Sequence, residues 1–266
     1  MLALELDRVT CRFPSRSSGV HVAVSDATVR VADGEFVSLV GPTGCGKSTL
    51  LNVAAGLRPP AEGAVRVFGE PLRGRNVHAG YLFQGDSLLP WRSARDNVLL
   101  GLQLRGTESA RAGAAADDWL RRVGLAGHGH KYPHELSGGM RKRVSLAQTL
   151  VVGPKILLMD EPFSALDVQT RALMENELLE LWQQDRKSVL FVTHDLEEAI
   201  ALSDRVVVLG AGPGSRPVGE FRIDLPRPRD VADIRLTPHF VELHRDIWHT
   251  LRTEVMRAHR AEEAAP

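Results

Sequence analysis

The chain has 266 residues, 43% hydrophobic and 25% charged, and its 33 basic and 33 acidic side chains cancel. This balance argues against a global basic surface for nucleic acid, although it is compatible with a local patch. Two cysteines exclude a disulfide framework and a four-cysteine zinc site, and no apolar run approaches the ~18 residues of a spanning helix. Because the start, MLALELDRVT, is acidic rather than cationic and apolar, we expect a soluble intracellular chain of one domain, with or without a subdomain.

Alternating apolar positions over residues 2–31 are typical of antiparallel strands at a sheet edge. The apolar run FVSLV (36–40) precedes a glycine-rich loop, and the helical pattern of residues 47–57 ends before Pro59-Pro60. Two more segments, VRVF (65–68) and GYLF (80–83), are strand-like.

Residues 86–135 are richer in Arg, Ala and Gly, and they contain helical pieces, so we interpret them as a helical insertion. Further on, strand-like and helical patterns alternate, which predicts an open, mostly parallel α/β sheet. Ligands of such sheets bind outside the carboxyl ends of the strands. The strand-like runs are KILLMD (155–160), SVLFVT (188–193) and RVVVL (205–209).

The loop GPTGCGKST (41–49) fits G-x-x-x-x-G-K-[ST], with a predicted strand before it and a helix after it. Its glycines let successive N–H groups face one anion, and the helix adds its dipole. Lys47 is predicted to reach the β- and γ-phosphates of a nucleotide, and Ser48 to hold Mg²⁺. A chance glycine turn would not account for this context. The predicted nucleotide-binding residues here are Gly41, Pro42, Thr43, Gly44, Cys45, Gly46, Lys47, Ser48 and Thr49, with Cys45 interpreted as space-filling rather than redox-active.

Two acids follow the buried run 155–160. Asp160 is placed to hold the Mg²⁺ shell, and Glu161 to polarise a water. A strand that merely ends in a turn is the alternative, but a phosphate loop in the same chain makes it a poor explanation. His194 follows the next strand and is predicted to contact a γ-phosphate or a catalytic water. Asp195 and Glu198 form a capping-box-like pattern that would fix where His194 points.

With LSGGM (136–140), the chain resembles the ATP-binding subunit of ABC transporters over about residues 2–225. The resemblance implies an α/β fold: a RecA-like P-loop NTPase core, an antiparallel β edge and a helical signature subdomain (about 86–148). It also implies that Ser137, Gly138 and Gly139 close over the γ-phosphate held by a second copy, so that two copies sandwich two ATP molecules. From the residues alone, this segment is equally a helix cap with flexible glycines.

Other positions follow from the same resemblance. Gln84 is similar to the glutamine that senses Mg²⁺ or water and couples to the membrane subunits, and Asp167 in SALD (164–167) to a residue that faces the other copy. Phe13 is similar to the aromatic that stacks on adenine, but it fits a core or edge-strand position equally well. The implied cofactors are ATP and Mg²⁺. The implied catalytic residues are Glu161, His194, Lys47 and Gln84, and the implied metal residues are Ser48, Gln84 and Asp160.

The segments 83–102, 132–143 and 225–230, with Met140 where most such subunits have Gln, resemble importers of the nitrate, sulfonate and taurine type. This implies ATP hydrolysis that powers uptake of a small solute through separate permease subunits, with a solute-binding protein as an indirect partner. The expected location is peripheral, at the cytoplasmic face of the inner membrane, without nucleic acid. Gln148-Thr149 and Val151-Val152-Gly153 depart from the group, at positions that bear on packing after the signature helix.

Two other classes of protein are alternatives. A soluble ATPase of the same superfamily could act on nucleic acid or ribosomes, but DNA-repair relatives insert long coiled coils where only residues 50–135 intervene here, and translation relatives carry two nucleotide domains. A metabolic P-loop kinase would leave LSGGM and SALD unexplained. Weaker signals are a histidine cluster (128–134), interpreted as a solvated loop rather than a metal site, Trp91 as an interface anchor or core residue, and a C-terminal linker and amphipathic helix (226–266) that packs or docks.

Overall fold

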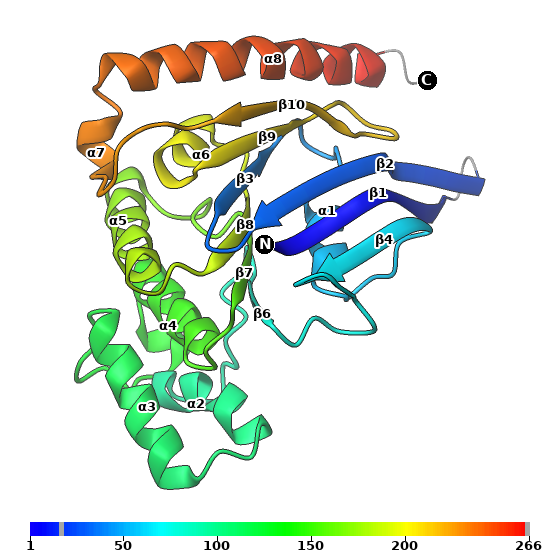
Figure 1. Ribbon diagram of the computed structural model, residues 1–266. Coiled ribbons are helices and arrows are strands. Elements are labelled where there is room, and N and C mark those ends of the chain that lie inside the picture. The colour runs from blue at the N-terminus through cyan, green and yellow to red at the C-terminus, as the bar shows by residue number, and fades with distance from the viewer. Residues whose placement is uncertain (16–18, 264–266) are drawn as a thin grey trace.

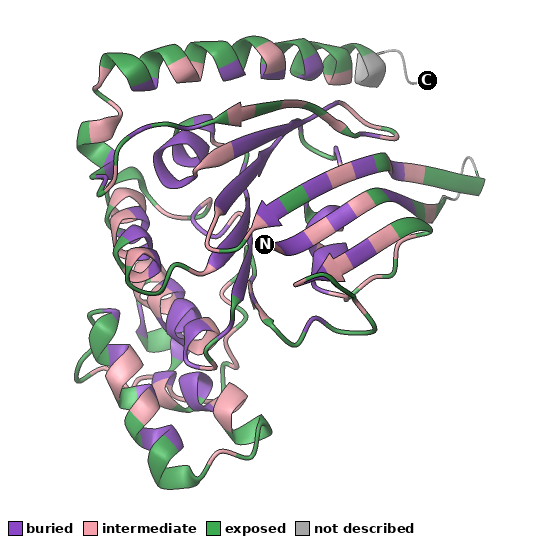
Figure 2. Ribbon diagram, in the orientation of Figure 1, coloured by how far each residue is buried: buried purple, intermediate pink, exposed green. Residues whose placement is uncertain are grey.

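Two β-sheets and three groups of helices form the architecture shown in Figure 1, a computed structural model that describes residues 1–15 and 19–263. The smaller sheet is antiparallel, with strand order β2-β1-β4-β5. Its long strands alternate between buried and exposed residues, as Figure 2 shows, because one face packs on the core and the other meets solvent. The strands are β1 (Leu2–Ser15), β2 (Gly19–Ala32), β4 (Glu62–Val67) and β5 (Glu70–Pro71).

The larger sheet has the order β10-β9-β3-β8-β7-β6, and all neighbours pair in parallel except β10 with β9. Every residue of β3 and β8 is buried, which explains why these segments read as unbroken apolar runs. The strands are β3 (Phe36–Val40), β6 (Ala79–Leu82), β7 (Ile156–Asp160), β8 (Ser188–Val192), β9 (Arg205–Leu209) and β10 (Pro217–Arg222).

Each face of the larger sheet has its own hydrophobic core. Val37 and Leu39 pack with α1 and the antiparallel sheet, whereas Phe36 and Val40 pack on the side of α5, α6 and α8. The long helix α8 lies along α6 and β10 at the top of Figure 1. The helices are α1 (Lys47–Ala54), α5 (Val168–Asp185), α6 (Leu196–Leu202), α7 (Val231–Ile234) and α8 (Pro238–Glu263).

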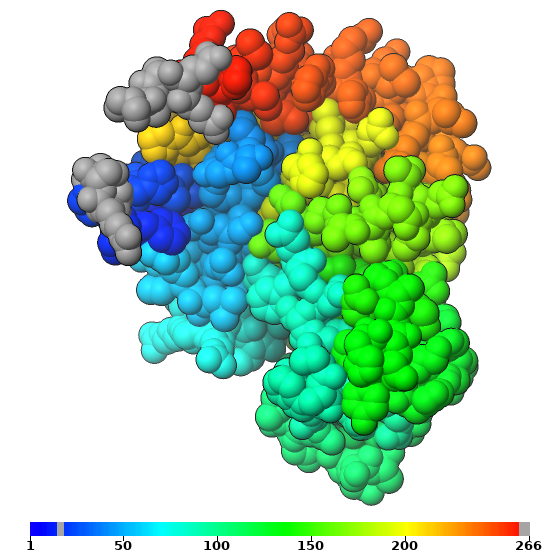
Figure 3. Space-filling view, turned by 180° about the vertical axis from the view of Figure 1, so that it is seen from behind, coloured from blue at the N-terminus to red at the C-terminus, as the bar shows by residue number. Residues whose placement is uncertain are grey.

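A further set, which we term the helical group, has a third core of its own. It projects from the sheet-bearing part of the molecule, as the space-filling view shows (Figure 3). The group comprises α2 (Ala94–Leu104), α3 (Ser109–Arg122), a 3₁₀ turn (Pro133–Glu135) and α4 (Gly138–Leu150). The predicted fold class, an α/β core with an antiparallel edge and a helical part that carries LSGGM, is confirmed.

Within the described residues, no helix combines the length and the apolar character needed to cross a bilayer. Trp91 is 72% exposed, so its alternative placement in the core is wrong. The predicted apolar face of α8 is only partly buried, because Trp248 and Val255 are exposed while Ile247 and Leu251 pack inward.

Candidate functional site

The phosphate loop connects β3 to α1, and its glycines are required by geometry. Gly46 has a φ of 93°, and a Cβ there would lie 2.5 Å from Val24 Cγ2. Gly46 also occupies the N-cap position of α1, where it offers no side-chain acceptor to the first N–H groups of the helix. These N–H groups and the positive end of the helix dipole therefore suit an anion.

Lys47 begins α1 and is only 6% exposed. Its Nζ donates to the carbonyl oxygens of Gly41, at 2.9 Å, and Pro42, at 3.0 Å, so the ammonium lies within the loop. Cys45 is fully buried beside it, and burial raises the pKa of the thiol despite the nearby Lys47 charge. A buried thiol that stays protonated fits the space-filling interpretation of Cys45.

A hydroxyl and a carboxylate meet next to the loop. Ser48 Oγ donates to Asp160 Oδ1 at 2.8 Å, and the Tyr81 hydroxyl lies 3.4 Å from Asp160 Oδ2 and 3.2 Å from Asn52 Oδ1. Burial raises the pKa of Asp160, while the Ser48 hydrogen bond opposes that change. These hard oxygen donors fit Mg²⁺. Tyr81 was missed at the level of sequence, because GYLF (80–83) indicates only a strand.

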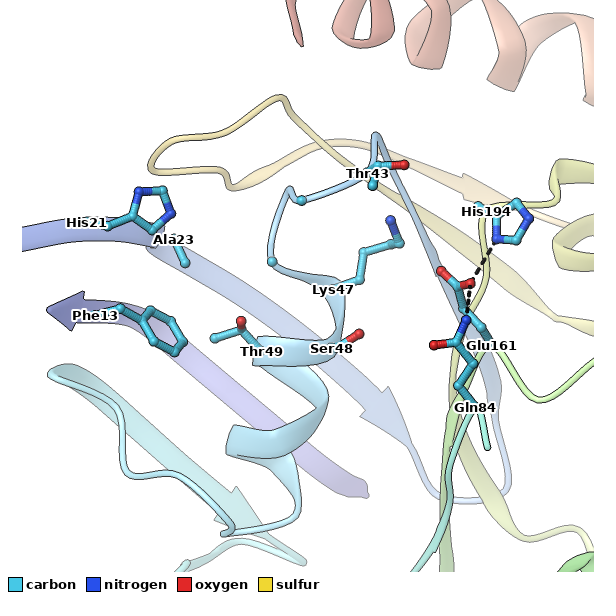
Figure 4. Close-up of a pocket in the computed structure, with 12 residues that line it drawn as sticks. Phe13, His21, Ala23, Thr43, Lys47, Ser48, Thr49, Gln84, Glu161 and His194 are labelled. Carbon is cyan, nitrogen blue, oxygen red and sulfur yellow. Dashed lines mark hydrogen bonds and ion pairs between the residues drawn. The ribbon is translucent and has the colours of Figure 1, made fainter. Parts of the chain in front are cut away.

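Three side chains converge at the carboxyl ends of neighbouring strands, and we call them the strand-end cluster. Gln84 follows β6, Glu161 follows β7 and His194 follows β8. Glu161 Oε2 lies 2.9 Å from His194 Nδ1 and 3.5 Å from Gln84 Nε2, as the dashed lines in Figure 4 mark. The cluster therefore faces the phosphate loop from the edge where parallel α/β sheets bind ligands.

The backbone of Glu161 aims its carboxylate. Its φ of 43° lies in the left-handed region, which a residue with a side chain seldom adopts. Its N–H donates to Val192 O at 2.9 Å, and Ser164 Oγ donates to its carbonyl oxygen at 3.0 Å. Neighbouring segments thus hold this unfavourable conformation, as is common at functional sites.

Of the two residues predicted to form a capping box after β8, Asp195 caps α6 and Glu198 does not complete the box. Asp195 accepts from the N–H groups of Glu197 and Glu198 at 2.9 and 3.1 Å, so it caps α6. The Glu198 side chain does not close the predicted box, because the N–H of Asp195 donates to Thr193 Oγ1, and Thr193 in turn donates to Glu198. Burial raises the pKa of Glu198 to about 8.

A cavity of about 700 Å³ joins these parts (Figure 4). Phe13 and His21, paired across β1 and β2, lie at the end opposite the strand-end cluster. The Arg58 guanidinium covers the Phe13 ring at 3.7 Å from its centroid. His21 was missed, although its place opposite Phe13 would follow from a correct hairpin register. The lining residues are Phe13, His21, Ala23, Thr43, Gly44, Gly46, Lys47, Ser48, Thr49, Gln84, Glu161 and His194.

The remaining predicted residues lie elsewhere. Ser137 caps α4 by accepting from the N–H of Met140 at 3.3 Å, and Asp167 caps α5 by accepting from that of Thr170 at 3.0 Å. The two caps are neighbours, since a Cβ at Gly139 would lie 2.8 Å from Thr170 Cγ2. Over the described part of the chain, the cavity lining includes neither Ser137–Gly139 nor Asp167. The described residues also contain no group of three metal-binding side chains around the 128–134 histidines.

A phosphate loop beside a carboxylate pair defines a P-loop nucleotide-binding protein. The chain belongs to the ABC transporter family, whose profile matches residues 24–164. The ABC transporter ATP-binding protein MJ0412 of Methanocaldococcus jannaschii is 43% identical over 255 residues, covering 96% of this chain and 93% of that protein. The predicted family is therefore confirmed, and the kinase alternative is excluded.

Two further relatives refine the picture. The nitrate import ATP-binding protein NrtC of Synechococcus elongatus is 38% identical over 253 residues, which cover 94% of this chain and 38% of that protein. A dimeric post-hydrolysis structure of the ATP-binding cassette MJ0796, bound to ADP and Pi, has a TM-score of 0.74 at 28% identity and covers 84% of this chain and 100% of that one. The chain is thus the ATP-binding and ATP-hydrolysing subunit of an ABC transporter.

Proposed function

We propose that this subunit hydrolyses ATP with Mg²⁺ between two copies of the chain, and so powers import of a small solute through separate permease subunits. The observation that carries the proposal is the Glu161 carboxylate, held by His194 and Gln84 at the strand ends opposite the phosphate loop. Ser48 and Asp160 would hold Mg²⁺, which neutralises charge on the phosphates when bound.

The proposed chemistry assigns each residue one task. Lys47 and the loop N–H groups bind the β- and γ-phosphates, and Glu161 orients or deprotonates the attacking water. A proton on His194 Nδ1 satisfies its contact with Glu161, and His194 is proposed to contact the γ-phosphate or the attacking water. Gln84 holds the same carboxylate from the opposite side. Since phosphoryl transfer requires little covalent catalysis, positioning and charge neutralisation supply most of the rate.

The second copy is proposed because each chain carries a further anion site outside its own cavity. The N-terminus of α4, with Ser137, Gly138 and Gly139, offers N–H groups and a helix dipole to a phosphate. Asp167 begins the neighbouring helix and is proposed to face the other copy. The dimeric form of the similar cassette MJ0796 supports this arrangement. Phe13 is proposed to stack on the adenine.

The import of a small solute rests on the relatives. NrtC is named for nitrate import, and CmpC of Synechocystis, 38% identical over 255 residues, for bicarbonate transport. We place the subunit at the cytoplasmic face of the inner membrane, with residues 1–225 as the ATPase domain and 226–266 as a C-terminal extension. The exposed Trp91, a few residues beyond Gln84, suits contact with a permease.

Co-purification tests the transport role. The tagged chain, isolated from gently solubilised membranes of its source, is expected to bring down a multi-span permease, and mutation of Trp91 to Ala is expected to weaken this association while preserving ATPase activity of the isolated chain. ATP-dependent uptake of nitrate, bicarbonate and taurine would then be measured in parallel with vesicles that contain the complex. Recovery without a permease, together with ribosomes or nucleic acid, would contradict the proposal and favour the soluble alternative.

A further inference from the structure

A buried lysine on α4 has no part in the chemistry described above. The Lys142 side chain is 2% exposed, and its Nζ donates to Phe83 O at 3.2 Å and Gln84 O at 3.0 Å. The ammonium also lies 3.9 Å from Asp86 Oδ1. A lysine has three donors, and the segment after β6 provides two carbonyl acceptors and an ion pair with Asp86.

Two other residues of α4, Arg141 and Ser145, also donate hydrogen bonds to the segment after β6. Arg141 Nε donates to Asp86 Oδ2 at 2.8 Å, and its NH1 donates to Leu136 O at 2.8 Å. Ser145 Oγ donates to Asp86 O at 2.8 Å. Residues 83–86, which contain Gln84, are therefore attached to the first two turns of α4, the helix that begins at the signature residues Ser137–Gly139.

Packing alone does not require a lysine at this position. Burying an ammonium costs desolvation free energy, and burial lowers the pKa of Lys142. A methionine would fill similar space without that cost. What the lysine adds is a set of donors for two carbonyl groups, one of which belongs to Gln84.

We propose that Lys142 is a positioning residue for ATP hydrolysis, which fixes the Gln84 backbone to α4 so that Gln84 and Ser137–Gly139 move as one body. The inference rests on the roles proposed above for Gln84 and for these signature residues. Gln84 Nε2 reaches Glu161 Oε2 at 3.5 Å, the long end of the hydrogen-bond range, so a small movement of α4 changes that contact. Docking of α4 on a second copy is thereby communicated to Glu161.

The test compares Lys142→Met, which removes the donors and keeps an unbranched apolar chain, with Lys142→Gln, whose amide can donate to both carbonyl groups. Lys131→Met is the matched control, since Lys131 lies in the loop before the 3₁₀ turn and outside this cluster. For the purified full chain we expect Lys142→Met to lower kcat about tenfold or more, with the dissociation constant for ATP within twofold of wild type and thermal stability undiminished. We expect Lys142→Gln to recover most of kcat, and the control to match wild type.

A double-mutant cycle separates this inference from the proposed role of Gln84. If Lys142 acts through Gln84, Lys142→Met has no further effect in the Gln84→Ala background. Independent losses that add in the double variant would overturn the inference, as would a normal kcat for Lys142→Met while Gln84→Ala is impaired. A normal kcat for Gln84→Ala itself would instead contradict the proposed role of Gln84. The positioning role of Lys142 would then have no basis.

Discussion

The cavity and the signature segment differ in how they are built. The cavity stands on β3, β7 and β8, buried strands between two hydrophobic cores, which hold the phosphate loop and the strand-end cluster in one frame. The signature residues begin α4, in a helical group with a separate core that projects from the sheet (Figure 3). We call the first the rigid half, because buried strands carry it, and the second the outlying half. A nucleotide cavity in one half and the anion site proposed for the other suit the proposed reaction between two copies.

The largest effect is expected at the rigid half. Lys47→Ala removes the ammonium that is proposed to bind the β- and γ-phosphates, so we expect kcat/KM for ATP to fall about 10³-fold and ATP binding to weaken strongly. Steady-state ATPase assays and titration with a fluorescent ATP analogue measure the two losses. Near-normal ATPase activity would break the assignment of the cavity.

Glu161→Gln, also in the rigid half, separates ATP binding from ATP hydrolysis. The amide can still accept from His194 but cannot take a proton from water, so we expect a roughly 10²–10³-fold lower kcat with ATP binding retained. Because ATP is not consumed, an ATP-stabilised dimer should appear in gel filtration. Intact turnover, with only monomer in the presence of ATP, would contradict the general-base role.

The outlying half is tested by Ser137→Arg. The long cation at the start of α4 should block approach of a second copy, so we expect about 10²-fold less ATPase activity while ATP binding by the isolated chain is unchanged. Ser93→Arg is the control, because Ser93 caps α2 in the same helical group, and loss of that cap costs about 1 kcal/mol of stability without affecting turnover. Equal ATPase activity of the two variants would mean that Ser137 acts only as a helix cap.

How far the sequence predicts each half depends on the range of the contacts. The phosphate loop, Asp160 and Glu161 were found because strand, loop and acid follow one another within a few residues. Tyr81 and Lys142 were missed, because their partners lie far away in the chain: Lys142 reaches Gln84 over 58 residues. Packing of α4 near β6 brings Lys142 to Gln84, and pairing of β6 with β7 brings Tyr81 to Asp160. Neither contact follows from the spacing of apolar residues.

The predicted role of Glu198 in the capping box was wrong for a related reason: the D-x-x-E pattern has two solutions. In one, Glu198 reaches the N–H of Asp195; in the other, realised here, a Thr193 hydroxyl lies between them. Burial raises the pKa of Glu198, whereas the hydrogen bond from Thr193 opposes that change. The spacing of the residues therefore predicted the helix start correctly, but not the hydrogen bonds that Thr193 makes with Asp195 and Glu198.

The smallest effect on activity is expected from substitution of Glu198, which instead changes how stability depends on pH. Burial raises the pKa of Glu198 from 4.5 to about 8, so the folded chain binds this proton more tightly than the unfolded chain does. By linkage, this carboxyl stabilises the fold fully below pH 4.5, and the contribution is lost as the pH rises through about 8. Glu198→Gln, which still accepts from Thr193, should remove that part of the pH dependence and leave ATPase activity within about twofold.

Thermal unfolding between about pH 5 and pH 8.5 measures the difference. The melting temperature of the wild type should fall more steeply with rising pH than that of Glu198→Gln, while Glu197→Gln, a neighbouring carboxylate with 54% of its side chain exposed, should follow the wild type. Identical curves for Glu198→Gln and the wild type would mean that Glu198 is charged in the folded chain. The Thr193–Glu198 contact would then hold a buried charge, and its desolvation cost would lower the stability of the rigid half.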